Sequence, residues 1–85
     1  MQRSRKDPVL QELGARLRES RKAAGFTQDE LAFRANLNPR FLGSVERGEK
    51  HIAVRRLLTL LGATGTHPAD FFREFPPELV FPAVE

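Results

Sequence analysis

The sequence contains no cysteine, no tryptophan and no tyrosine. Without cysteine the chain can form neither a disulfide nor a thiolate metal site, which is compatible with a reducing compartment. All seven aromatic residues are phenylalanine, so a core built from them has few polar ring substituents that need buried hydrogen bonds. With 85 residues, 40% of them hydrophobic, the chain can form one domain with a modest core.

Long apolar runs are also missing, and none approaches the roughly 20 residues that a membrane span needs. The polar N-terminus lacks the apolar segment of a signal peptide, so we expect a soluble cytoplasmic protein with no membrane partner. The two histidines, His51 and His67, stand alone, and neither a Gly-rich phosphate loop nor a metal-ligand spacing is present. We therefore expect no enzyme activity, no cofactor and no metal.

The charge is unevenly distributed along the chain. Residues 1–22 carry seven basic and three acidic side chains, whereas residues 66–85 carry one basic and four acidic side chains. A basic first part suits a surface that faces phosphates, and an acidic end suits a surface kept away from DNA. Ordinary scatter over a solvated surface would explain the same pattern.

Helix start and stop signals predict an all-α fold, a compact bundle of five helices. Asp7-Pro8 and Asn38-Pro39 are N-cap and first-turn pairs, and Thr27 with Glu30 forms a capping box. The predicted helices cover residues 8–24, 28–35, 39–47, 54–64 and 68–74. No segment has a convincing strand pattern with a partner.

We divide the chain into three parts. Residues 1–7 form a basic N-terminal arm, of which residues 1–6 are expected to be disordered. Residues 8–75 form the helical domain. Residues 76–85 form a proline-containing tail, in which Pro76-Pro77 should block further helix.

The link between the second and third predicted helices is unusually short. Only Asn36 and Leu37 separate Ala35, the last inward residue, from the N-cap Asn38. So short a link forces the two helices to cross at a steep angle. Ala32 is small enough for close approach at the crossing, and the apolar Leu37 should fill it.

This crossing turns one face of the third helix outward. Leu42 and Val45 are expected to pack inward, so the opposite face carries only small or basic residues and no carboxylate. Such a face can enter the DNA major groove, which is roughly 12 Å wide. Its residues are Pro39, Arg40, Gly43, Ser44 and Arg47.

Two segments carry a family resemblance: Thr-Gln-Asp-Glu-Leu-Ala at 27–32 and Leu-Asn-Pro-Arg-Phe-Leu-Gly-Ser-Val-Glu-Arg-Gly at 37–48. Together they resemble the Cro and phage-repressor type helix-turn-helix, and the resemblance extends over about residues 10–72. The run 41–50 is most similar to the small stand-alone controller proteins of restriction-modification systems. The resemblance implies a helix-turn-helix fold and sequence-specific binding of double-stranded DNA in the control of transcription.

The geometry of the outward face of the third helix predicts the base contacts. The family resemblance agrees with this prediction. Arg40 lies near the start of the third helix and could donate two hydrogen bonds to guanine O6 and N7. Ser44, one turn further on, could contact a base edge directly or through water. Gly43 would allow close backbone approach, and Pro39 completes the predicted base-contacting set.

Phosphate contacts are predicted around this face. Gln28 stands at the start of the second helix, where free backbone N–H groups favour a phosphate. Arg47 and Lys50, near the end of the third helix, and Asn38, at its N-cap, are further candidates. For the two cations, simple solvation is the alternative.

Arg21 and Glu46 are assigned by resemblance alone. In the resembled family an arginine and a glutamate at the matching positions form a partly buried ion pair between the first and third helices. The resemblance therefore implies a structural role for this pair, with the guanidinium held near a phosphate.

One such domain reads about one half-site, so a homodimer on a palindromic operator is expected, with half-sites about 34 Å apart. The apolar C-terminal part is the predicted dimer surface, although it could instead complete the monomer core. Its candidates are Phe72, Phe75, Leu79, Val80 and Phe81.

The protein would repress transcription by blocking RNA polymerase or activate it by contacting the polymerase. The rival hypothesis is an antitoxin-like protein whose tail holds a second protein.

Overall fold

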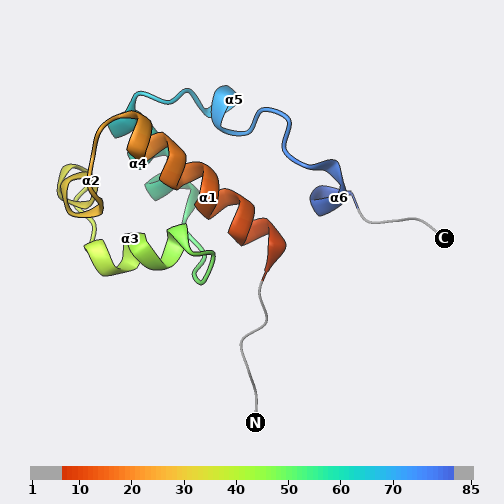
Figure 1. The fold of residues 1–85 in the computed structure, drawn as a ribbon, viewed down its shortest axis with the longest axis horizontal. Helices are drawn as coiled ribbons and strands as arrows, with labels where there is room; N and C mark the ends of the chain where they lie inside the picture. Colours follow the sequence, from red (N-terminus) through yellow and green to blue (C-terminus); the bar gives the residue numbers. More distant parts are fainter. Residues whose placement is uncertain (1–6, 82–85) are drawn as a thin grey trace, which may run out of the picture.

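The computed structural model describes residues 7–81, and within this range the chain is helical and contains no strand (Figure 1). The four longer helices are α1 (Pro8–Ala23), α2 (Gln28–Arg34), α3 (Pro39–Glu46) and α4 (Val54–Thr64). Two single-turn helices follow, α5 (Pro68–Phe71) and α6 (Pro77–Val80). The all-α prediction is confirmed, and the first four helices match within one residue at each end. The predicted disorder of residues 1–6 lies outside the described residues.

The predicted caps start the first two helices. Asp7 Oδ1 accepts a hydrogen bond from the backbone N–H of Val9 at 2.9 Å. Thr27 Oγ1 accepts from the backbone N–H of Glu30 at 3.1 Å, and the Glu30 carboxylate accepts from the N–H of Thr27 at 2.9 Å. Each cap gives a partner to backbone groups that the helix itself leaves unpaired, which fixes where the helix begins.

The core lies among the four longer helices and α5. At seven and eight residues, α2 and α3 are too short to be stable alone in water, so packing must hold them. The buried apolar side chains are Leu17, Leu31, Ala32, Leu42, Val45, Leu57, Leu60, Leu61 and Phe71. Among the helices of residues 7–81, none is long and apolar enough to cross a membrane.

α1 and α3 approach each other closely at Gly14. A Cβ atom on Gly14 would lie 2.3 Å from the carbonyl oxygen of Val45 and 2.5 Å from that of Glu46. Both are backbone atoms, which cannot move aside as the end of a flexible side chain can. Gly14 therefore lets the C-terminal part of α3 rest directly on α1.

The C-terminal part differs from the prediction in two places. The fifth helix was expected to reach residue 74, but α5 ends at Phe71 and a turn follows, with Glu74 in the left-handed region at φ +52°. The prediction that Pro76-Pro77 blocks further helix is wrong, because Pro77 starts α6. Proline fits the first position of a helix, where its missing N–H would have no helical partner. The chain thus has six helices in its described part, not five.

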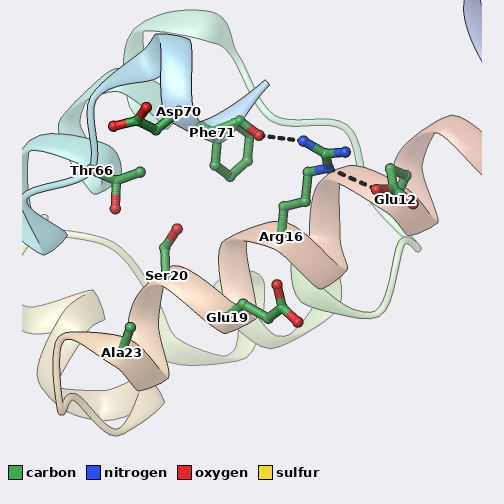
Figure 2. A pocket seen from close by; sticks show the side chains of 8 residues that line it. All are labelled: Glu12, Arg16, Glu19, Ser20, Ala23, Thr66, Asp70 and Phe71. Atoms are coloured by element: carbon green, nitrogen blue, oxygen red, sulfur yellow. Dashed lines mark hydrogen bonds and ion pairs between the residues drawn. The ribbon is translucent and has the colours of Figure 1, made fainter. Parts of the chain in front are cut away.

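Arg16 of α1 attaches this segment to the domain. Its guanidinium donates hydrogen bonds to the carbonyl oxygens of Phe71 at 2.7 Å, Arg73 at 2.8 Å and Glu74 at 3.2 Å. It also lies over the ring of Phe75, 5.0 Å from the centroid. Figure 2 shows the side chain reaching from α1 to the Phe71 carbonyl beside an open hollow. Nothing in the sequence around Arg16 had predicted this role.

Candidate nucleic-acid interface

The link between α2 and α3 has the sharp bend that the sequence predicts. Asn36 adopts the left-handed conformation with φ +56°, and the backbone N–H of Leu37 donates to the carbonyl of Ala32 at 2.8 Å. The side chain of Asn38 then caps the new helix, accepting from the backbone N–H of Arg40 at 2.7 Å. In Figure 1, α2 is seen nearly end-on while α3 lies across the view.

This bend directs the start of α3 outward. Leu42 and Val45 are 0% and 3% exposed and face the core, whereas Pro39 and Arg40 are exposed. In Figure 1, α5 and α6 lie on the other side of α1 from α3. The orientation predicted for Arg40 is therefore confirmed, and the outer face of α3 is separate from the C-terminal segment.

Gly43 does not lie on the open surface, which corrects the predicted outward face. It is buried, and the position of its absent Cβ lies 3.3 Å from Gln28 Oε1 and 3.3 Å from Arg47 Nη1. These two side chains cover it. The small residue thus makes room for the Gln28 amide to lie across α3.

Arg21 and Glu46 form the ion pair that the resemblance implies. Arg21 Nε and Nη2 donate to the two carboxylate oxygens of Glu46, at 2.8 Å and 3.1 Å, and each residue is 8% exposed. Arg21 Nη1 also donates to the carbonyl of Phe26 at 2.9 Å. The pair joins α1 to α3 and satisfies both buried charges.

Gln28 extends this pair into a network of three side chains. Its Nε2 donates to Glu46 Oε1 at 2.9 Å, so the side-chain amide of this predicted phosphate-contacting residue is held by a buried carboxylate. No spacing in the sequence signals this bond, because it joins residues 18 positions apart. The network ties the start of α2 to the end of α3 and so fixes the geometry of the pair of helices.

Arg47 lies on the exposed edge of α3 and is held by Glu49. Its Nε and Nη2 donate to the two Glu49 oxygens at 3.1 Å and 3.2 Å, and Nη2 also lies 3.4 Å from Ser44 Oγ. The hydrogen bonds to Glu49, and then its negative charge, raise the pKa of Arg47 above the ordinary arginine value. Arg47 is therefore a permanent cation that already has an anionic partner.

The remaining predicted site residues lie at the surface. Lys50, in the loop after α3, and Asn38 are exposed. Of the predicted dimer residues, Phe72, Val80 and Phe81 are 43%, 53% and 71% exposed, and Phe75 and Leu79 are half-buried. One further apolar residue at the surface, Phe33 of α2, was not predicted from the sequence and is 87% exposed. Within residues 7–81, no group of three or more histidine or acidic side chains could hold a metal ion.

Comparisons with known proteins find the same helix-turn-helix arrangement. The family model described as "Helix-turn-helix domain" matches residues 12–71. The restriction-modification controller protein C.AhdI from Aeromonas hydrophila is 38% identical, over 75% of this chain and 97% of that one, with a TM-score of 0.71. The clp gene regulator ClgR from Corynebacterium glutamicum is 33% identical, over 87% of this chain and 80% of that one, with a TM-score of 0.77.

A third solved structure shows the same fold at lower identity. It is the restriction-modification controller protein C.Esp1396I as a tetramer in complex with its natural 35 base-pair operator. It is 20% identical, over 88% of this chain and 99% of that one, with a TM-score of 0.74. No curated protein sequence matches this chain. By its family match and its identity to C.AhdI and ClgR, the chain belongs to the helix-turn-helix domain family.

Proposed function

We propose that the protein is a sequence-specific transcriptional regulator that binds a palindromic operator as a homodimer, with α3 in the major groove. The observation that carries the proposal is the outward start of α3, where Arg40 is exposed on a helix fixed by the buried Arg21–Glu46 pair. The names of the relatives support it, since C.AhdI is a controller protein and ClgR a gene regulator. C.Esp1396I, which shares the fold, was solved on its operator.

Arg40 is the main base-reading residue in this proposal. A guanidinium near the start of a groove-bound helix can donate two hydrogen bonds to one guanine. Ser44 lies one turn further along, and its hydroxyl donates to the Arg40 carbonyl at 3.1 Å, which leaves oxygen lone pairs to accept from a base or water. Pro39 would contact the groove wall, while Gly43 contributes by seating Gln28.

Phosphates would be held around this face by Arg47, Lys50 and the two helix starts. Since the Gln28 amide nitrogen donates to Glu46, we assign its phosphate contact to the backbone N–H in the first turn of α2. Asn38 uses its oxygen for the cap, which leaves its amide nitrogen as the donor. These contacts would position the helix without reading sequence.

The test is selection of bound duplexes from a random DNA pool at a stated salt concentration. We expect a palindromic motif with half-sites about one helical turn apart. Arg40→Ala should relax preference at one base pair in each half-site. Arg47→Ala should weaken binding to all sequences alike and lower the salt slope by at most about one. Failure to enrich any motif would contradict the proposal.

The second candidate is an antitoxin-like protein that binds DNA while its tail holds another protein. The exposed Val80 and Phe81 on and after α6 favour it. Co-purification of the chain from its native source separates the two functions. A small protein recovered in fixed ratio would support the antitoxin-like role, and a homodimer alone would support the regulator.

A further inference from the structure

The turn that follows α3 holds Glu49 in a fixed place beside Arg47. Gly48 adopts φ +77°, its N–H donates to the carbonyl of Val45 at 3.0 Å, and the Glu49 N–H donates to the carbonyl of Ser44 at 2.9 Å. This is the paired hydrogen-bond pattern of a Schellman helix end. The Glu49 backbone is therefore part of the helix terminus and not of a loose loop.

Packing against α1 restricts this turn further. A Cβ atom on Gly48 would lie 2.8 Å from Gln11 Cα and 2.9 Å from Gln11 N, so the turn rests on the α1 backbone. The carboxylate of Glu49 is thus presented to the Arg47 guanidinium by a rigid segment. Both side chains remain open to solvent, at 58% and 56% exposed.

The two hydrogen bonds between Glu49 and Arg47 resemble those that a phosphate would form with the same guanidinium. A carboxylate and a phosphate both present two oxygens to the fork of a guanidinium. Arg47 cannot bind a phosphate with the same N–H groups while Glu49 occupies them. If all three stayed together, the carboxylate would lie next to a phosphate of like charge, which is unfavourable.

We propose that Glu49 is an intramolecular competitor of the DNA backbone for Arg47 and thereby sets the affinity of the protein for DNA. The inference rests on the proposed function. In the free protein Arg47 is bound by Glu49, and on DNA it exchanges the carboxylate for a phosphate. The exchange also releases Ser44 Oγ from Arg47 Nη2, 3.4 Å away, so that a base edge can use it.

The competition between Glu49 and DNA phosphates for Arg47 should change how DNA binding depends on salt concentration. When Arg47 leaves Glu49, the carboxylate loses one cationic partner, and cations from solution compensate for part of that loss, which offsets part of the cation release from DNA. Removing the carboxylate should therefore steepen the salt slope, by up to about one unit. Because an exposed ion pair is weak, the gain in affinity should be about two- to fivefold.

The experiment compares Glu49→Gln with Glu19→Gln. The control makes the same chemical change at an exposed residue of α1 that lines the hollow toward α5 and belongs to neither proposed surface. Binding is measured by fluorescence anisotropy across a salt series, on a duplex selected from the random pool and on a random-sequence duplex. Thermal unfolding of each variant checks that the fold is intact.

We expect Glu49→Gln to bind both duplexes about two- to fivefold more tightly, with the steeper slope, and Glu19→Gln to keep the affinity and slope of the original protein. In an Arg47→Ala background the gain from Glu49→Gln should shrink markedly, because Arg47 is no longer there for Glu49 to hold. Unchanged or weaker binding by Glu49→Gln would overturn the inference and leave the proposed function intact. If the original protein binds neither duplex, both fail.

Discussion

At the scale of single residues, the buried ion pair has a full set of partners. Both oxygens of Glu46 accept from Arg21, and one of them also accepts from Gln28. Among the described residues, no buried side-chain nitrogen or oxygen lacks a hydrogen-bond partner. Because taking a charge out of water is costly unless its partners are in place, each member of this network depends on the others.

Glu46→Ala should destabilise the fold by about 3–5 kcal/mol, because it leaves the Arg21 charge buried without its partner. The free energy of unfolding, measured by urea denaturation, checks this. The fraction that stays folded should keep its base preference, since Glu46 does not face the groove.

The matched control replaces both charges, Arg21→Met together with Glu46→Met. The double variant should be more stable than Glu46→Ala, because no unpaired charge remains. A Glu46→Ala protein as stable as the original would show that the ion pair contributes nothing to folding.

Side-chain partners at this scale were the least predictable part of the site. The resemblance implied the Arg21–Glu46 pair, but the bonds from Gln28 to Glu46 and from Arg47 to Glu49 were not predicted. Long side chains can reach several partners, and only the folded positions of their helices decide among them. For the same reason Gly43 was expected at the surface, although it lies beneath two such side chains.

At the scale of elements, the helix starts were predictable because their signals are local. A capping side chain and the backbone N–H it binds are two or three residues apart. The short link from Asn36 to Asn38 likewise fixed how α2 leads into α3. The end of α5 was missed because non-local bonds from Arg16 hold the residues around it. α6 was missed because Pro77, expected to block a helix, starts one.

Gly14→Ala should destabilise the protein although alanine favours helix. The new methyl would overlap the α3 backbone, with 2.3 Å to the Val45 carbonyl oxygen, and overpacking of this kind costs about 1–3 kcal/mol. Thermal and urea denaturation measure the change.

Gly62→Ala in α4 is the matched control, since nothing lies within 4 Å of its absent Cβ. There the better helix propensity of alanine acts alone and should stabilise by about 0.5–1 kcal/mol. If both substitutions stabilised the protein, the close contact between α1 and α3 would not limit the packing.

At the scale of the whole molecule, the surfaces proposed for DNA binding and for dimerisation lie on different sides of α1. In our proposal the outer face of α3 binds DNA. The segment with Phe72, Val80 and Phe81 lies across α1 from that face in Figure 1. The apolar residues of the C-terminal part indicated a surface away from the basic face, whereas the charge distribution left ordinary scatter as an alternative. Whether this segment forms the dimer depends on a second copy, which the monomer fold does not determine.

Phe81→Glu should weaken self-association by about tenfold or more. The change replaces an apolar side chain of the proposed dimer interface with a charge, and central apolar residues carry much of the energy of an interface. Sedimentation velocity over a range of protein concentrations measures it. The control is Phe33→Glu, which makes the same change at an exposed phenylalanine on α2 and should leave association unchanged. An original protein that is monomeric at high micromolar concentration would contradict the dimer.

The attachment made by Arg16 has a consequence for how such proteins can diverge. Its hydrogen bonds to residues 71, 73 and 74 all end on main-chain oxygens, which every amino acid supplies. Substitutions at Arg73 can therefore change what this end of the protein displays while its anchorage is kept. If two copies associate there, related proteins could acquire mismatched ends and avoid pairing with each other, with no change in α3.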